Sequence, residues 1–371
     1  MKTRAALLRE APGKWEIATV DLDPPKTGEV LVRMLASGLC HSDDHFATGD
    51  IPVETLPFVG GHEGAGVVES VGPGVDDLEP GDYVVTVFVP ACGRCRWCAS
   101  GMQNLCDNGS RMLIGSQLDG TFRMHLDGAD VGQGGCISTF SEYSVMPAAS
   151  CIRVDPDLEA SVACLLGCGV PTGWGSATRA ADVQAGDVVL VIGIGGVGIN
   201  AVQGARHVGA GHVLAVDPVD FKREIALRLG ATEVFADVNA AAERARALTD
   251  GQGADSAIVT VGVLNGDHLG QAFAAIRKGG TVVATSAAPA SAVGVPVSLL
   301  ELTMFQKRLQ GAIYGMGSPA REIPRLIGLY RAGALKLDEL VTRTYALDEI
   351  NEAFADMHAG RNVRGVITFA G

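Results

Sequence analysis

Hydrophobic and polar positions follow a different pattern in the two halves of the chain. Up to about residue 170, short apolar runs lie between glycine and proline turns, and no long helical period interrupts them. The strands predicted here are 29–35, 66–71, 82–89 and 140–145. Short strands between closely spaced turn signals are typical of an antiparallel or barrel-like domain.

After Thr172 the pattern changes to apolar strands that alternate with amphipathic helices. The predicted strands are 187–192, 213–216, 256–261 and 281–285. The predicted helices are 200–208, 221–229 and 270–277. This alternation indicates βαβ units on a parallel sheet, with about six strands before residue 315.

The last part of the chain, from about residue 313, carries predicted helices at 321–331 and 347–358 and a final strand at 365–369. We expect this strand to return to the first domain. The fold class is therefore α/β, with a mostly β domain and a doubly wound parallel-sheet domain.

Composition narrows the classes of function. With 47% hydrophobic and 19% charged residues, the chain is typical of a compact enzyme. Its net charge of -13 and lack of a basic run argue against nucleic acid or an anionic membrane as partners. Neither a signal peptide nor a membrane span of roughly 20 apolar residues is evident. Nine cysteines in such a chain favour a reducing, cytoplasmic location.

Four cysteines are spaced C-x2-C-x2-C-x7-C in a polar, glycine-bearing segment. They are Cys92, Cys95, Cys98 and Cys106. Structural zinc binds four thiolates in a tetrahedron, and two-residue gaps let one loop supply three of them. We predict a structural zinc lobe at about 90–110, with disulfides as the disfavoured alternative. Cys136, Cys151 and Cys164 are interpreted as small buried side chains.

A glycine-rich loop, Gly193-Ile194-Gly195-Gly196-Val197-Gly198, follows an apolar strand and opens an apolar helix. In a dinucleotide site Gly193 would allow the tight turn, Gly195 the approach of the pyrophosphate, and Gly198 close packing of helix on strand. Asp217, at the end of the next strand, can bind the ribose 2′-hydroxyl and would repel a 2′-phosphate. The loop therefore predicts NAD(H), and a glycine turn with a capping Asp is the alternative.

A second group of metal-binding side chains, Cys40, His62 and Cys168, is scattered along the chain, each close to glycine. Taken singly, each residue type is more often structural. Beside a four-cysteine site and a dinucleotide loop, however, a Cys₂His set predicts a catalytic zinc with an open fourth position. Two Zn²⁺ ions per chain are thus expected.

These motifs together resemble the zinc-dependent medium-chain alcohol dehydrogenases along essentially all 371 residues. Segments 36–45, 173–176 and 216–223 are most similar to the actinobacterial nitrosodimethylaniline-dependent group, whose members retain and recycle the nicotinamide in place. The resemblance implies a GroES-like catalytic domain, a Rossmann NAD-binding domain and a dimer or tetramer. The catalytic domain is expected to contain residues 1–170 and 313–371, and the NAD-binding domain residues 171–312.

The resemblance also implies roles at the catalytic centre. Cys40, His62 and Cys168 would hold the zinc, Glu63 would be a nearby or transient ligand, and Asp43 would orient His62. Ser42 and His45 match positions of a proton relay. The implied cofactor contacts are His41 and Arg364 to the pyrophosphate, Thr172 and Val197 to the nicotinamide, and Lys222 to the adenosine ribose.

The substrate pocket departs from many relatives at one point. Phe88 keeps one of two bulky groups that narrow the pocket, but the facing segment reads Gly134-Gly135-Cys136-Ile137. We expect a roomier pocket here.

The predicted activity is hydride transfer between a primary alcohol or aldehyde and NAD(H), with a cofactor that exchanges or is retained and serves an acceptor such as nitrosodimethylaniline. A thiol-dependent formaldehyde dehydrogenase is the nearest alternative, although no cationic anchor for a thiol carrier is obvious. A non-catalytic zinc- and NAD-binding protein would be expected to lack metal ligands. A zinc-ribbon nucleic-acid reader is opposed by the acidic charge.

Overall fold

The computed structural model describes residues 1–369, which form two compact units. The first unit contains 1–168, 318–327 and the chain from Leu337 onward, and the second contains 169–317 and 328–336. From the sequence, the corresponding boundaries are expected after residues 170 and 312. Segment 328–336 belongs to the second unit, whereas the sequence assigns it to the β-rich domain.

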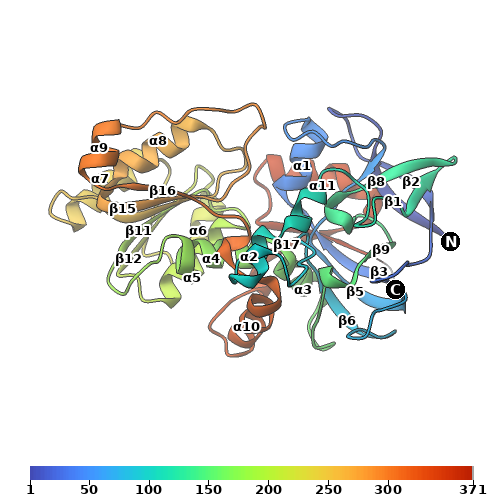
Figure 1. Cartoon of the computed structure of the whole chain (residues 1–371). Coiled ribbons are helices and arrows are strands. Elements are labelled where there is room, and N and C mark those ends of the chain that lie inside the picture. The colour runs from blue at the N-terminus through green and yellow to red at the C-terminus, as the bar shows by residue number, and fades with distance from the viewer. Residues whose placement is uncertain (370–371) are drawn as a thin grey trace. The chain divides into compact units, whose positions relative to one another are not determined.

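The first unit contains a closed β-barrel and a larger sheet (Figure 1). The barrel strands, in spatial order, are β1 (Lys2–Leu8), β2 (Glu16–Leu22), β7 (Met124–Leu126), β8 (Ala129–Gln133) and β4 (Phe58–Val59). The sheet strands, in order, are β10 (Cys151–Arg153), β6 (Tyr83–Thr86), β5 (Gly64–Val71), β3 (Glu29–Gly38), β18 (Arg364–Thr368) and β17 (Val341–Tyr345), and β9 (Tyr143–Pro147) also pairs with β3. The last strand thus returns to the first unit.

Strand β3 organises this sheet, because it pairs with β5, β9 and β18. Alternate side chains, Val30, Val32 and Met34, are buried in one core. The strand ends at Gly38, just before Cys40, and β5 begins directly after Glu63. The same alternation that forms the strands therefore positions candidate ligands at their ends.

Two strand predictions in this unit are too long. The predicted strands 82–89 and 140–145 correspond to β6 and β9, but β6 ends at Thr86 and β9 begins at Tyr143. The α-helices of the N-terminal part of the chain are α1 (His41–Thr48), α2 (Arg96–Ala99) and α3 (Ala160–Ala163). Those of the C-terminal part are α10 (Pro319–Arg331) and α11 (Ile350–His358).

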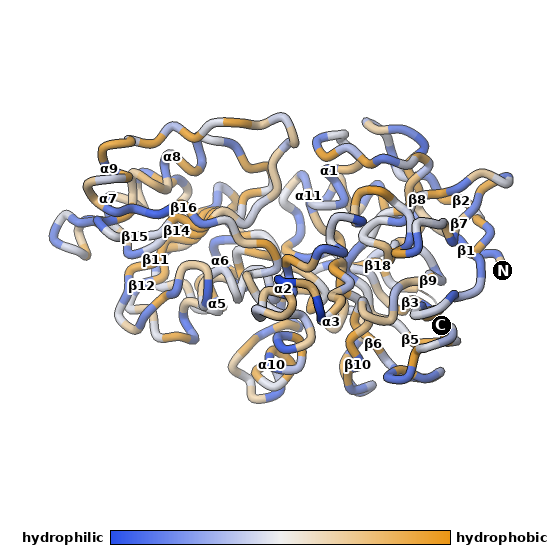
Figure 2. The backbone as a smooth tube through the Cα atoms, viewed as in Figure 1, coloured by the Kyte–Doolittle hydropathy of each residue, from blue (hydrophilic) through white to orange (hydrophobic). Residues whose placement is uncertain are grey.

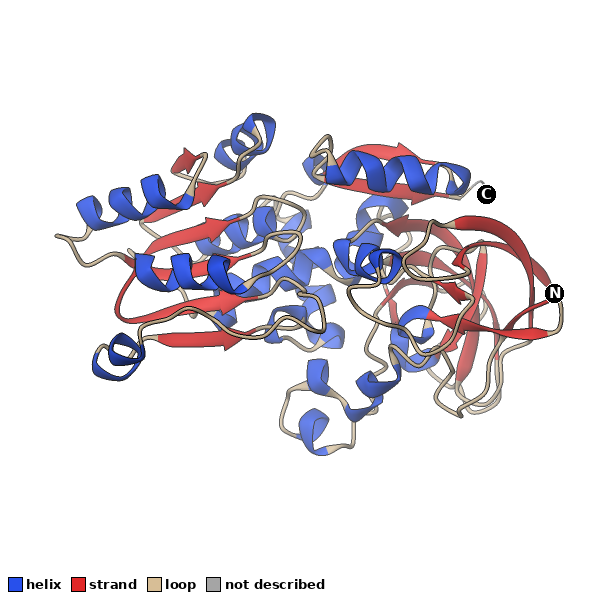
Figure 3. Cartoon of the chain, turned by 90° about the horizontal axis from the view of Figure 1, so that it is seen from above, coloured by secondary structure: helices blue, strands red, loops and turns tan. Residues whose placement is uncertain are grey.

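The second unit is built on a parallel sheet of six strands (Figures 1 and 3). In spatial order they are β13 (Glu233–Phe235), β12 (His212–Val216), β11 (Val188–Ile192), β14 (Ala254–Val259), β15 (Ile276–Ala284) and β16 (Arg308–Gly311). The helices are α4 (Gly169–Gly175), α5 (Gly198–His207), α6 (Asp220–Arg228), α7 (Val238–Leu248), α8 (Gly266–Ala275) and α9 (Leu299–Met304). When the six strands are numbered by their position along the chain, their spatial order across the sheet is 3-2-1-4-5-6, which is the doubly wound arrangement.

The predicted helix at 270–277 is displaced, since α8 ends at Ala275 and Ile276 already starts β15. β15 is an interior strand, and the strands of this sheet are strongly hydrophobic, as Figure 2 shows in orange for β11 and β14. On β11, Val188, Leu190 and Ile192 face one core together with α7 and α8. No helix among residues 1–369 is both long enough and apolar enough to cross a membrane.

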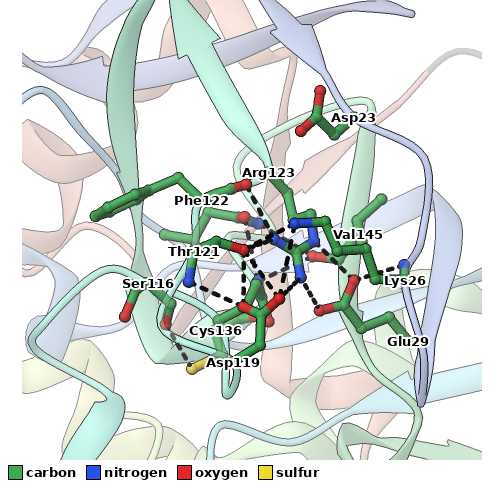
Figure 4. Close-up of polar contacts among 12 residues, drawn as sticks. Asp23, Lys26, Glu29, Ser116, Asp119, Thr121, Phe122, Arg123, Cys136 and Val145 are labelled. Carbon is green, nitrogen blue, oxygen red and sulfur yellow. Dashed lines mark hydrogen bonds and ion pairs between the residues drawn. The ribbon is translucent and has the colours of Figure 1, made fainter.

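A buried arginine ties the barrel to the sheet of the first unit (Figure 4). Arg123 is fully buried, and its Nε and Nη2 donate to the two carboxylate oxygens of Glu29 over 2.8 and 2.6 Å. Nη2 also donates to Asp119, and Nη1 donates to the Thr121 hydroxyl and the Phe122 carbonyl oxygen. Partial burial opposes charge on Asp119, but hydrogen bonds from the Thr121 backbone and from Arg123 lower its pKa to about 2.

We predict that Arg123→Ala destabilises the protein by about 3–5 kcal/mol, because it leaves the buried carboxylate of Glu29 without its ion-pair partner and, among the described residues, with only the Lys26 N–H as a donor. The midpoint of thermal unfolding should fall by on the order of 10 °C, measured by calorimetry. Replacing both partners, Glu29→Met with Arg123→Met, should recover most of the loss. The matched control is Arg33→Ala, whose pair with Glu69 is 2.7 Å long but partly exposed, and which should cost less than about 1 kcal/mol. Equal losses for both arginines would contradict the prediction.

Candidate functional site

Four potential metal ligands from three distant segments meet in the first unit. Cys40 lies between β3 and α1, His62 and Glu63 precede β5, and Cys168 follows a short 3₁₀ turn. One ligand atom of each residue lies within 4.8 Å of those of the other three. Cys40, His62 and Cys168, predicted together from the sequence, are therefore neighbours in space.

The imidazole of His62 is oriented by a buried carboxylate. Nδ1 of His62 lies 2.9 Å from Oδ2 of Asp43, whose Oδ1 accepts the backbone N–H of Gly61. Among the described residues, Nε2 of His62 is buried without a hydrogen-bond partner. An imidazole fixed at one nitrogen by a carboxylate and open at the other is the arrangement of a metal-binding histidine.

Electrostatics in this cluster favour a positive charge. Burial lowers the pKa of His62, but Asp43 and Cys40 raise it by more, so that it lies well above its usual value. A hydrogen bond from Cys168 lowers the pKa of the Cys40 thiol and raises that of Cys168. A proton or a metal ion is therefore stabilised at this place, and two thiols, an imidazole and a carboxylate are a donor set that fits zinc.

Glu63 is held by an arginine from the far end of the chain. Its carboxylate accepts a hydrogen bond from Nη2 of Arg364, and both side chains are buried. Burial raises the pKa of Glu63 to about 7 against the opposing charge of Arg364. Sequence reasoning missed this pair, because 301 residues separate its members.

Ser42 and His45 lie three residues apart on helix α1, which begins immediately after Cys40. The Cys40 thiol lies 3.6 Å from the hydroxyl oxygen of Ser42. His45 is buried, and its Nδ1 lies 3.0 Å from a carboxylate oxygen of Asp50. The helix thus places a hydroxyl beside the metal cluster and an imidazole one turn away from it.

The four remaining predicted metal ligands form a separate cluster. Sulfur atoms of Cys92, Cys95, Cys98 and Cys106 lie within 4.8 Å of one another, and all four are free thiols. The Cys92 N–H donates to Cys106 Sγ, and the Cys95 N–H donates to Cys92 Sγ, over 3.2 and 3.3 Å.

Charge on sulfur is unequally favoured in this four-cysteine cluster. Backbone N–H groups of Cys98 and Asp107 lower the pKa of Cys95 to about 6, whereas burial raises that of Cys98 to about 12. The donor set is all sulfur, as in closed structural zinc sites, and a divalent cation would offset the cost of charging the buried thiols.

In the second unit, the glycine loop joins β11 to α5 with the geometry that a dinucleotide site needs. Gly193 has φ of +91°, and a β-carbon there would come within 2.9 Å of the Thr260 backbone. A β-carbon on Gly198 would lie 1.9 Å from the Gly193 oxygen, whereas the space beside Gly195 is open. The loop therefore packs closely on the sheet and leaves its outer side accessible to a phosphate.

Asp217 follows β12 and touches this loop directly. Its Oδ2 accepts the backbone N–H of Ile194, and its Oδ1 accepts that of Val219. Two residues that the sequence analysis did not single out also hold the loop: the Asn200 amide donates to the Gly196 oxygen, and the Thr260 hydroxyl donates to the Gly193 oxygen. Asn200 faces the loop from one turn into α5, so helical spacing could have identified it.

The other predicted cofactor contacts are divided between the units. Thr172 on α4, Val197 in the loop and Lys222 on α6 belong to the second unit. His41 belongs to the first unit, where its ring lies 6.5 Å from that of His358.

Phe88 lies between the metal cluster and the turn that contains Gly135. Its ring meets that of His62 edge-on at 5.5 Å. A β-carbon on Gly135 would lie 3.2 Å from that of Phe88, and φ at Gly135 is +60°. The two segments expected to line the substrate pocket are therefore in contact.

Comparisons with known proteins agree with this geometry. Residues 26–156 match the family model for the alcohol dehydrogenase GroES-like domain, and residues 196–331 match that for zinc-binding dehydrogenases. The chain is 51% identical to an NDMA-dependent alcohol dehydrogenase of Amycolatopsis methanolica, over 99% of both chains. It is 37% identical to an S-(hydroxymethyl)glutathione dehydrogenase of Escherichia coli over the full length of both. The crystal structure of benzyl alcohol dehydrogenase from Acinetobacter calcoaceticus superposes with a TM-score of 0.90 and 30% identity, over 100% of both chains.

Proposed function

Because the chain belongs to the zinc-binding alcohol dehydrogenases with a GroES-like domain, we propose that it transfers hydride between a primary alcohol or aldehyde and NAD(H). The observation that carries this proposal is the cluster of half-buried Cys40 with buried His62 and Cys168, in which Nε2 of His62 has no hydrogen-bond partner among the described residues. The formaldehyde alternative is less favoured, since the relative named for a glutathione adduct is more distant.

Cys40, His62 and Cys168 would hold a catalytic zinc, and the four-cysteine cluster would hold a structural one. The catalytic zinc supplies a Lewis acid that lowers the pKa of the alcohol. Asp43 keeps Nδ1 of His62 occupied, which fixes the ring with Nε2 directed into the cluster. Arg364 pairs with Glu63 close to the thiols. This ion pair prevents the buried carboxylate of Glu63 from being an uncompensated charge.

The proton from the alcohol must leave a buried site. Ser42 is placed to accept it beside Cys40, and His45, one helical turn further on with its Nδ1 3.0 Å from Asp50, is placed to pass it on. Cofactor binding would use the loop from Gly193 to Gly198 for the pyrophosphate and Asp217 for the ribose, with His41, Thr172, Val197, Lys222 and Arg364 as further contacts.

We also propose that the nicotinamide cofactor stays bound between turnovers, as the 51% identity to an NDMA-dependent enzyme suggests. Reoxidation would then need an acceptor that reaches the bound cofactor, for which nitrosodimethylaniline is the artificial probe. A cytoplasmic location is supported by the free thiols of the four-cysteine cluster, which a reducing compartment preserves.

The function is tested with Cys40→Ala. Wild-type protein should contain about two zinc ions per chain by elemental analysis, absorb near 340 nm after dialysis when reduced with alcohol, and turn over with nitrosodimethylaniline. The variant should lose one zinc and turnover while still binding NADH. The control is Cys151→Ala, which removes a buried cysteine outside both clusters. Turnover of Cys40→Ala within about tenfold of wild type would refute the catalytic cluster, since loss of the Lewis acid should cost several kcal/mol.

Cofactor choice should depend on Asp217. Replacing it in the double variant Asp217→Gly, Pro218→Arg removes the charge that repels a 2′-phosphate and adds a guanidinium that attracts one. We expect the ratio of dissociation constants for NADPH and NADH to fall by about tenfold or more, measured by fluorescence on protein stripped of cofactor. Because Asp217 also accepts two backbone hydrogen bonds, Asp217→Asn is the control for loosening of the loop. An unchanged ratio would remove Asp217 from cofactor selection.

A homo-oligomer is supported by apolar side chains near an edge of the second unit's sheet. Leu299, Leu300 and Met304 on α9 are 67–74% exposed, and α9 appears largely orange in Figure 2. Only residues 305–307 separate α9 from β16, an edge strand in which Leu309 is 40% exposed. An unpaired edge beside exposed hydrophobic side chains favours association with a second copy.

We predict that Leu300→Asp together with Leu309→Asp shifts the protein toward monomers, because both changes place charge in an apolar contact. Analytical ultracentrifugation of the wild type should give a dimer or larger assembly, and the variant should sediment as a smaller species at the same concentration. Leu227→Asp, which alters an exposed leucine on α6, is the control. A monomeric wild type, or an unchanged assembly in the double variant, would contradict the prediction.

A further inference from the structure

A cavity of about 250 Å³ in the second unit is lined by basic side chains. Its lining residues come from the C-terminal ends of α5 and α6 and from the segment before Leu337. Its titratable lining residues are Arg206, His207, Arg228 and Lys336, and no carboxylate lines it. The cavity is distinct from the glycine loop, which lies at the opposite end of α5, about 15 Å away for a helix of ten residues.

This concentration of positive charge is unusual in a chain with a net charge of -13. Arg206, Arg228 and Lys336 lie within ion-pairing distance of no carboxylate in the part of the chain that the structure describes. Basic residues at helix C-termini complement the helix dipole, which accounts for Arg206 and Arg228 singly. The helix dipole does not account for Lys336, which lies after the end of α10. Nor does it explain why three cationic side chains line one cavity that no carboxylate lines.

The cations are positioned by packing and backbone hydrogen bonds instead of by carboxylates. Gln203 is buried on α5 and makes two hydrogen bonds to the backbone of Lys336. Its amide group donates to the Lys336 carbonyl oxygen over 3.0 Å, and its side-chain oxygen accepts the Lys336 N–H over 2.8 Å. The aliphatic stem of Arg206 lies against Gly230, where a β-carbon would come within 3.1 Å of it. His207 rests against the buried ring of Trp174, with 4.9 Å between ring centroids. The backbone at Lys336, the stem of Arg206 and the ring of His207 are thus held in place without a ligand.

We propose that this cavity binds the phosphoryl group of a small phosphorylated metabolite. Two guanidinium groups match the oxygens of a phosphate dianion in a forked geometry, and the lysine adds a point charge. Gly230, Gly333 and Ala334 also line the cavity, and residues with such small side chains let a phosphate approach the backbone. The volume of about 250 Å³ lies below the roughly 300–1,000 Å³ of typical small-molecule sites, which suits a compact ligand better than a dinucleotide.

The test uses the holoprotein saturated with NADH, so that the glycine loop is filled. Isothermal titration calorimetry at constant ionic strength should detect glucose 6-phosphate with a dissociation constant of about 1 mM or tighter. Arg228→Gln and Lys336→Gln should each weaken this binding by about three- to tenfold, since each removes a charge-assisted contact at an exposed site. Inorganic phosphate should bind no more tightly than the sugar phosphate.

The matched control is Arg246→Gln, which removes an arginine from the last turn of α7, outside the cavity. It should leave the dissociation constant unchanged. No detectable binding, or equal weakening by Arg246→Gln, would overturn the proposal, as would tighter binding of inorganic phosphate than of glucose 6-phosphate. All the substituted side chains are exposed, so the variants should fold as the wild type does.

Discussion

Close approach of backbone segments around the candidate metal cluster is the constraint on which the first unit depends. A β-carbon on Gly38 would lie 2.2 Å from a carboxylate oxygen of Glu63, and one on Gly167 would lie 2.6 Å from the Thr86 oxygen. Glycine at these two positions lets the end of β3, the start of β5 and the turn before Cys168 meet. Without this contact, residues more than 100 positions apart could not share one ion.

The same reasoning explains which parts of the fold and site can be predicted from sequence. The cysteine spacing, the glycine loop and the interior strands are local patterns, and membership of the family confirms the predicted GroES-like and Rossmann domains. The sequence predicts about six strands for this sheet and the sheet has six, but the two edge strands could not be located because they are short and carry polar residues such as Glu233 and Arg308. Apolar alternation is weak where only one side of a strand is paired.

Long-range pairs of charges escape prediction for a different reason. Arg123 reaches Glu29 across 94 residues, and Arg364 reaches Glu63 across 301. Nothing in the spacing of these residues identifies their partners, and each arginine alone suggests a surface position. A buried charge needs a partner of opposite charge, so the two members of each pair are buried together. The partners can be identified only from the folded structure, in which the strands bring them side by side.

The two candidate metal clusters differ in what they leave available. In the four-cysteine cluster every donor is a sulfur, and backbone N–H groups contact several of them, so that thiolates would fill all four positions of a bound ion. In the other cluster the fourth donor is Glu63, whose carboxylate is shared with Arg364. Because Arg364 already pairs with this carboxylate, Glu63 would be the weakest of the four donors to a bound ion, and its position is the one that a substrate oxygen would take most easily.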